Sequence, residues 1–319
     1  MKNWIRSAVA TFCCIGSLGN ANAFSFSDRQ QCDCWNTPSE CSCGENCECD
    51  SGCPSWTSTS WVGLQGNFGQ GIGDDPGHGS LEAFLGNPNC SDCGTWLPFL
   101  DLEADWYKNK SWGATAGLGL RWMNREKSRV WGANLYYDYR RLHQHGFNQV
   151  GVGFESLGKV WDFRINGYIP VGKTKFKTRT TLFDDFIGDF FMIRREYDVA
   201  LTGFDAEFGI YLARCGCWAL YGAAGPYYFE NHDFNRHFWG GQARVALEYG
   251  RYIWIEAQGT HDKEFHSKLQ GVVKVMLPFD ILFDACCTVN NICLDILSQP
   301  VRRIDPIVTE KECCWQWNF

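Results

Sequence analysis

Apolar and polar residues alternate with a period of two along most of the chain from Trp61 onward. Between residues 100 and 106, for example, apolar side chains alternate with Asp101, Glu103 and Asp105. This period is typical of β-strands with one apolar face, and short connections between strands favour antiparallel neighbours. The segments with this pattern are 61–68, 99–106, 112–122, 130–140, 147–155, 161–169, 204–212, 218–229, 242–248, 252–261, 268–277 and 307–312.

The polar face of these segments indicates whether the strands lie in a membrane or in water. It carries many glycines and charges of both signs, as the lumen of a narrow membrane barrel requires, while the apolar face would meet lipid. Tryptophans such as Trp106, Trp112, Trp131 and Trp161 lie near segment ends, where aromatic girdles belong. The segments also approach the roughly 9–11 residues of a membrane-spanning strand. We therefore predict an all-β, antiparallel transmembrane β-barrel over residues 58–319, with a soluble, sugar-binding β-sandwich as the alternative.

Charged residues on the predicted inward face are interpreted as structural. Carboxylates and guanidinium groups in a narrow lumen form charge networks more often than acid–base pairs. A barrel hydrolase with its active site at the lipid face would need Ser and His at outward positions, and His261, which has the outward phase, lies at a segment end. We predict no enzymatic activity and no catalytic residue. The predicted lumen-facing charge network is Asp138, Arg140, Glu155, Asp162 and Arg164.

The N-terminus has the features of a secretory signal peptide. Lys2 and Arg6 precede a short apolar run, and Ala21-Asn22-Ala23 supplies a small-residue cleavage site. We predict cleavage after Ala23, with a buried N-terminal helix as the alternative. The predicted mature chain is therefore exported.

Residues 24–57 form a separate, polar segment that contains three Cys-x-Cys pairs followed by Cys53. The segment has too few apolar residues to bury a core, so disulfides or a metal must hold it, and an oxidising compartment favours disulfides. Because Cys-x-Cys is short for an internal bridge, the partners are expected elsewhere. The disulfide candidates in the predicted mature chain are Cys32, Cys34, Cys41, Cys43, Cys47, Cys49, Cys53, Cys90, Cys93, Cys215, Cys217, Cys286, Cys287, Cys293, Cys313 and Cys314.

Composition narrows the remaining classes of function. The 319 residues are 16% aromatic and 20% charged, with a net charge of −7. Such a chain is too aromatic to be disordered and lacks the basic footprint of a nucleic-acid-binding protein. His143 and His145 have a spacing that could hold a metal, but they fall in a predicted hairpin loop. We predict no cofactor, no metal site and no nucleic-acid partner.

Three consecutive segments, 131–141, 145–155 and 161–170, resemble the β-domain of inverse autotransporters of the intimin/invasin type. Residues 201–207 and 299–309 resemble the middle and closing segments of that domain. The resemblance covers residues 60–312 and implies a twelve-stranded outer-membrane barrel, which agrees with the twelve candidate strands above. It also implies outer-membrane lipid and the barrel-assembly machinery as partners.

The chain departs from this family at both ends. Family members continue into an exported adhesive passenger, whereas this sequence ends soon after the last candidate strand, so we expect no passenger. A cysteine-rich segment stands where a peptidoglycan-binding module is common. The combination is similar to cysteine-rich outer-membrane proteins of chlamydia-like bacteria, which implies periplasmic anchoring through disulfides to other envelope proteins. A small pore is the alternative function, with segments 171–197 and 280–300 as candidate plugs.

Overall fold

The computed structural model describes residues 59–73, 77–91, 94–109, 111–123, 129–142, 144–187, 190–215, 217–278, 296–304 and 307–318. Apart from Cys215 and Cys217, these residues belong to one compact unit. Within these ranges, no helix is both long and apolar enough to cross a membrane. The predicted signal peptide and cysteine-rich segment lie outside the described residues.

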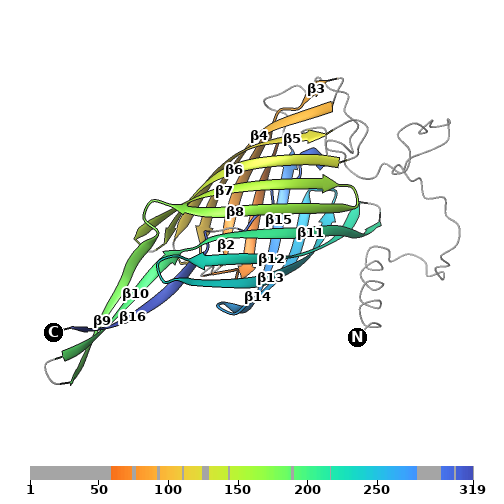
Figure 1. Ribbon diagram of the computed structural model, residues 1–319. Coiled ribbons are helices and arrows are strands. Elements are labelled where there is room, and N and C mark those ends of the chain that lie inside the picture. The colour runs from red at the N-terminus through yellow and green to blue at the C-terminus, as the bar shows by residue number, and fades with distance from the viewer. Residues whose placement is uncertain are drawn as a thin grey trace, which may run out of the picture. The chain divides into compact units, whose positions relative to one another are not determined.

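Twelve antiparallel strands close into a barrel (Figure 1). Neighbours in the sequence pair along most of the wall, and the barrel closes where β2 pairs with β4. A short strand, β3 (Asn89–Ser91), pairs with the beginning of β4. The barrel strands are β1 (Trp61–Gly69), β2 (His78–Gly86), β4 (Gly94–Tyr107), β5 (Trp112–Met123), β6 (Arg129–Leu142), β7 (His145–Gly158), β8 (Trp161–Val171), β11 (Thr202–Cys215), β12 (Trp218–Asn231), β13 (Arg236–Tyr249), β14 (Ile253–Asp262) and β15 (His266–Pro278).

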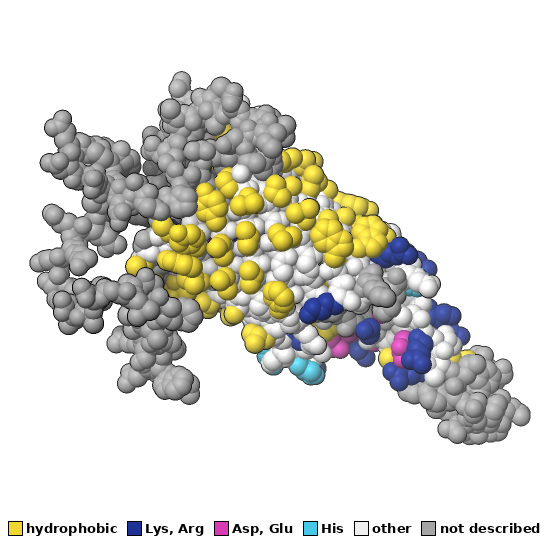
Figure 2. Space-filling model, turned by 180° about the vertical axis from the view of Figure 1, so that it is seen from behind, with side chains coloured by type: hydrophobic (Ala, Val, Ile, Leu, Met, Phe, Trp, Pro, Cys, Tyr) yellow, Lys and Arg dark blue, Asp and Glu magenta, His cyan; other side chains and the backbone are white. Residues whose placement is uncertain are grey.

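The alternation in the sequence becomes an inside and an outside of this wall. Along β5 and β6, exposed and buried positions alternate almost strictly. Exposed side chains on the outer face include Leu64, Leu118 and Leu135, and Figure 2 shows apolar side chains forming a broad band over the barrel wall. The buried positions carry polar and charged side chains, which is the reverse of a water-soluble sandwich and is the arrangement of a membrane barrel.

The predicted number of barrel strands is confirmed, but one of the twelve was assigned wrongly. Residues 309–312 of the predicted strand 307–312 lie in β16 (Thr309–Asn318), which pairs with β10 outside the barrel wall. Its place in the barrel is taken by β2, which the alternation did not reveal. The outward positions of β2 include Gly79 and Ala83, and Phe84 faces inward, so its apolar pattern is weak.

A three-stranded sheet accounts for one of the segments considered as a plug. The described residues of 171–197 do not fill the lumen, because most of them form β9 (Lys175–Ile187) and β10 (Phe190–Ala200). These strands pair with each other, and β10 also pairs with β16. The sheet extends away from the end of the barrel at which β8 ends and β11 begins (Figure 1). Lysines and arginines gather toward this sheet, beyond the apolar band (Figure 2).

Inward-facing glycines make room for large inward side chains. A Cβ atom on Gly117 would lie 2.1 Å from the ring of Tyr136, which packs across it from the neighbouring strand. Tyr136 is buried, and its hydroxyl donates a hydrogen bond to Asp101 Oδ2 at 2.7 Å. The glycine is therefore required for close packing of the ring, and a methyl group there would displace this contact.

We expect Gly117→Ala to lower the free energy of unfolding by about 1–3 kcal/mol, because overpacking forces the ring of Tyr136 to move. Gly241→Ala is the matched control, since a Cβ atom there meets no other atom within 4 Å. Urea unfolding of the refolded protein in detergent micelles, followed by tryptophan fluorescence, measures the free energy of unfolding of both variants. Equal stabilities for the two variants would contradict the packing argument.

Candidate functional site: the occupied lumen

The five residues predicted to face the lumen are all buried inside the barrel. Asp138, Arg140, Glu155, Asp162 and Arg164 are each at most 5% exposed. They occupy inward positions of three neighbouring strands, β6, β7 and β8. In water such groups would be hydrated, so inside a narrow barrel each needs a charged or hydrogen-bonding partner.

These five residues are divided among several contacts. Glu155 accepts a hydrogen bond from Arg121 Nε at 2.6 Å. Arg164 lies 3.3 Å from Asp162 and 3.7 Å from Glu207, and it donates to the hydroxyl of Tyr221. Asp138 and Arg140 bind elsewhere, to a segment that enters the lumen from the C-terminal part of the chain.

We call residues 296–304, 307 and 308 the luminal segment. Its first residues, Ile296 and Leu297, pack in an apolar cluster with Trp61 and Phe84, at the end of the barrel where β1 begins. Its last residues pack at the opposite end, where Ile304 and Val308 join a cluster of aromatic side chains from β8, β12 and β13. Two apolar clusters therefore hold the ends of a segment that runs through the lumen.

Side chains of the barrel wall bind the backbone of the luminal segment between these clusters. Arg121 donates to the carbonyl oxygens of Leu297 and Gln299, at 2.5 and 2.6 Å. Arg140 donates to the carbonyl of Ile307 at 2.8 Å. Three further contacts of this kind are Trp61 Nε1 to the Ser298 carbonyl (2.9 Å), Asn166 Nδ2 to the Arg302 carbonyl (3.1 Å) and the Ile304 amide to the Tyr168 hydroxyl (2.7 Å).

Two arginines of the luminal segment supply charge to the wall. Arg303 binds Asp138 with both terminal nitrogens, at 2.8 and 2.5 Å, which is the strong bidentate geometry. Arg302 lies 3.5 Å from Glu256 and stacks over the ring of Trp254. Asp138 and Glu256 come from opposite parts of the wall. The two arginines therefore link both sides of the wall to the luminal segment.

The charge clusters also contain residues that do not belong to the predicted lumen-facing network. Arg244 donates twice to Glu207, at 2.7 Å each, and once to Glu256 at 2.8 Å. The alternation places Arg244 and Glu207 inward, but it carries no information about which inward residues meet across the barrel. Arg302 and Arg303 belong to a segment outside the alternating pattern, and the family resemblance was the one signal that included them.

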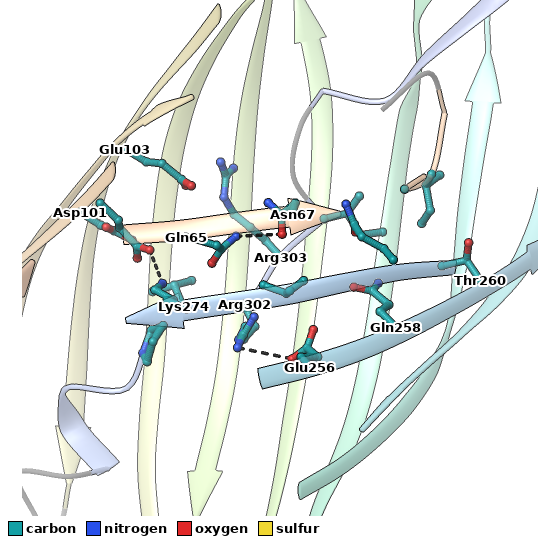
Figure 3. A pocket seen from close by; sticks show the side chains of 18 of the residues that line it. Gln65, Asn67, Asp101, Glu103, Glu256, Gln258, Thr260, Lys274, Arg302 and Arg303 are labelled. Carbon is teal, nitrogen blue, oxygen red and sulfur yellow. Dashed lines mark hydrogen bonds and ion pairs between the residues drawn. The ribbon is translucent and has the colours of Figure 1, made fainter. Parts of the chain in front are cut away.

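A polar cavity of about 90 Å³ remains between the luminal segment and the wall formed by β1, β2, β4, β14 and β15. Figure 3 shows Asp101, Glu103 and Lys274 on the wall side, with Arg302 and Arg303 of the luminal segment. Such a volume holds several water molecules. Among the described residues, no three His, Cys, Asp or Glu side chains are arranged to hold a metal ion.

Few of the candidate cysteines fall within the described residues. Cys217 is disulfide-bonded, whereas Cys215, Cys313 and Cys314 are free thiols in the structure. Cys313 is exposed on β16, and Arg194 Nη2 lies 3.3 Å from its sulfur. Outside the described residues lie Cys32, Cys34, Cys41, Cys43, Cys47, Cys49, Cys53, Cys93, Cys286, Cys287 and Cys293, together with the side chain of Cys90.

Acidic residues also pack where β16 meets the barrel end. Glu310 accepts a hydrogen bond from Asn231 at 2.8 Å, and Arg236 lies 3.2 Å from Glu312 and 3.9 Å from Glu310. Burial, together with the nearby carboxylates of Glu312 and Glu264, raises the pKa of Glu310 to about 7. Glu310 therefore changes its charge near neutral pH, at the contact between β16 and the barrel.

Part of the barrel wall matches a known protein family. Residues 86–215, from the end of β2 to the end of β11, match the inverse autotransporter β-domain. A comparison with curated proteins finds no match.

Solved structures of other proteins are similar to this chain at low sequence identity. One, from work on the mechanism of in-meso crystallization of membrane proteins, is 17% identical with a TM-score of 0.52, and the alignment covers 79% of this chain and 100% of that chain. The β-domain of the Bordetella autotransporter BrkA is 12% identical (TM-score 0.38; coverage 69% and 98%). The KdgM porin in complex with disordered oligogalacturonate is 7% identical (TM-score 0.37; coverage 69% and 99%). Only the first of these three is similar enough to show the fold.

We expect Arg303→Gln to lower the free energy of unfolding by about 3–5 kcal/mol, because it leaves the buried carboxylate of Asp138 without its cation. The double variant Arg303→Gln, Asp138→Asn removes both charges and should lose less than the single variant. Urea unfolding in detergent micelles measures the three proteins. Strictly additive losses would show that the two side chains do not depend on each other.

The raised pKa of Glu310 predicts that the contact between β16 and the barrel weakens as the pH rises. Between about pH 4.5 and 7 the folded protein keeps a proton on Glu310 that the unfolded chain has released, so stability falls across this window and is constant above it. Hydrogen exchange should give lower protection factors for β16 amides at pH 8 than at pH 6, once intrinsic exchange rates are corrected. Glu310→Gln should remove most of the difference, and equal protection in the unaltered protein would contradict the prediction.

Proposed function

We propose that this bacterial outer-membrane barrel, in which residues 86–215 carry an inverse autotransporter β-domain, serves as a closed structural element of the cell envelope. The observation that supports this function is the occupied lumen. The luminal segment is held by an apolar cluster at each end and by the bidentate pair of Arg303 and Asp138 between them. A segment held at so many points is expected to stay in place.

The orientation we propose follows from an even number of strands. β1 begins and β15 ends at the same end of the barrel, since Trp61 pairs with Pro278. If the cysteine-rich segment 24–57 is periplasmic, this end faces the periplasm. The luminal segment then leads outward, and β9, β10 and β16 lie on the cell surface. After cleavage of the predicted signal peptide, the barrel-assembly machinery would insert the chain into outer-membrane lipid.

We propose that disulfides connect the barrel to other cysteine-rich envelope proteins. Segment 24–57 is the main candidate because it carries seven cysteines, an odd number. Cys313 adds a site on β16, because its free thiol is exposed and the thiolate form of a cysteine is the species that exchanges with a disulfide. That thiolate would attack a disulfide of the partner, forming a mixed disulfide and releasing the second partner sulfur as a thiolate.

A small pore is the second candidate function, and the polar cavity beside the luminal segment is the observation that favours it. The described residues leave a space of only about 90 Å³ there, so substantial passage of solutes would require the luminal segment to move. We propose no catalytic role, because the buried polar groups of the lumen are engaged mainly with each other and with the luminal segment.

Outer-membrane fractions should contain a heat-shifted band of this chain, with high-mass forms that collapse on reduction. Cys313→Ser should remove the high-mass forms in which a disulfide joins Cys313 of β16 to a partner protein, because the substitution removes this exposed thiol. Cys314→Ser is the matched control, since Cys314 is less exposed than its neighbour. Electrophoresis with and without reductant and boiling, followed by blotting, tests this. A heat-shifted band that is monomeric without reductant would keep the barrel and remove the cross-linking role.

A further inference from the structure

Two carboxylates that line the polar cavity form no hydrogen bond or ion pair with a cation among the described residues. Asp101 and Glu103 lie on β4 with their side chains directed inward, and Glu103 is paired in register with Glu82 on β2. Three carboxyl groups are therefore close together on adjoining strands. Lys274 is the cation of this wall, and it forms an ion pair with Glu82.

The other cations around the cavity are also engaged. Arg303 is bound to Asp138 by two hydrogen bonds, and Arg302 pairs with Glu256. Neither of them contacts Asp101 or Glu103 through any hydrogen bond or ion pair of the described residues. The wall formed by β2 and β4 is therefore more negative than the rest of the cavity lining.

Asp101 also has one oxygen that is buried without a partner. Its Oδ2 accepts the hydroxyl of Tyr136 at 2.7 Å, but Oδ1 has no hydrogen-bond partner within the described part of the chain, and the residue is only 5% exposed. A carboxyl group in such a place either is ionised and needs a positive charge beside it, or keeps its proton and stays neutral. Figure 3 shows Asp101 and Glu103 beside the cavity.

The remaining lining supplies the neutral oxygen atoms that a cation needs. Gln65 and Asn67 from β1 and Gln258 and Thr260 from β14 surround the space, and Thr260 Oγ1 also has no hydrogen-bond partner in the described structure. Hard cations prefer carboxylate, carbonyl and hydroxyl oxygens. Although three carboxyl groups are close together, no three acidic, histidine or cysteine side chains of the described residues are arranged to hold a metal ion, so the lining suits a partly hydrated monovalent ion rather than a chelated metal.

From this geometry we propose that the cavity beside the luminal segment binds a small monovalent cation, such as Na⁺ or K⁺, as the counter-charge of Asp101 and Glu103. The ion would sit between the wall and the luminal segment, where it neutralises the excess negative charge of β2 and β4. A proton on Asp101 is the competing counter-charge, and it would make the protein indifferent to the identity of the cation.

The test measures the unfolding temperature of the full chain, refolded in detergent micelles, by the heat-dependent shift in electrophoresis. Chloride salts of Na⁺, K⁺ and N-methylglucamine are compared at equal ionic strength, since N-methylglucamine is too bulky to enter the cavity. We expect Na⁺ or K⁺ to raise the unfolding temperature by roughly 3 °C or more. Asp101→Asn and Glu103→Gln should each remove this difference.

Asp205→Asn is the matched control. Asp205 is buried in the same lumen, but it does not line this cavity, and Tyr168 and Asn166 already donate hydrogen bonds to its carboxylate. This variant should be less stable and still respond to Na⁺ or K⁺. If Asp101→Asn does not fold, Glu103→Gln still tests whether the cavity carboxylates bind the cation, because Glu103 is only partly buried and its substitution disturbs folding less.

Sodium NMR gives a second readout that does not depend on unfolding. The unaltered protein should broaden the sodium resonance, K⁺ should reverse the broadening by competition, and Glu103→Gln should show much less of it. Equal unfolding temperatures of the unaltered protein in all three salts, without excess broadening, would overturn the proposal in favour of the proton. Equal stabilisation of the unaltered protein and both cavity variants would also overturn it, because the ions would then act elsewhere.

Discussion

The structure depends on the pairing of charges inside a closed wall. A barrel that faces lipid must place its polar residues in the lumen, and here the lumen is too narrow to hydrate all of them. Arg121, Arg140 and Asp138 would each be a buried charge with an incomplete set of partners if the lumen held only side chains of the wall. The luminal segment completes these sets, with carbonyl oxygens for the arginines and the Arg303 guanidinium for Asp138. Barrel and segment are therefore one electrostatic unit.

The apolar contacts at the two ends decide where that unit begins and ends. Ile296 and Leu297 join Trp61 and Phe84 at one end, and Ile304 and Val308 join aromatic residues at the other. Hydrophobic burial is not directional, so it can hold the ends of the segment without specifying its register. The hydrogen bonds to individual carbonyl groups between the two clusters supply the register. This division of roles fits the sequence of the segment, in which Ser298, Gln299, Arg302 and Arg303 lie between the two apolar ends and Val301 packs against the first cluster.

Much of the wall could be predicted from the sequence, because alternation has a direct geometric meaning in a strand. It located eleven barrel strands and the inward phase of residues such as Asp138 and Arg164. It failed at β2, where Gly79 and Ala83 weaken the apolar face, and at β16, where alternation continues outside the barrel. A strand that pairs in a separate sheet has the same period as one in the wall, so periodicity alone cannot distinguish them. The topology is decided by long-range pairing that local pattern does not encode.

The charge partners were less predictable for a similar reason. The inward phase of a residue shows that it faces the lumen, but not which strand lies across from it or what fills the space between. Arg244 meets Glu207 and Glu256 because β13 lies beside β14 and near β11 in the closed wall, and Asp138 meets Arg303 only because a distant segment enters the barrel. Buried ion pairs are costly to leave incomplete, so the same contacts that could not be predicted are those on which folding depends most. Closure of the wall and entry of the luminal segment must therefore be coupled, because each supplies the partners that the other lacks.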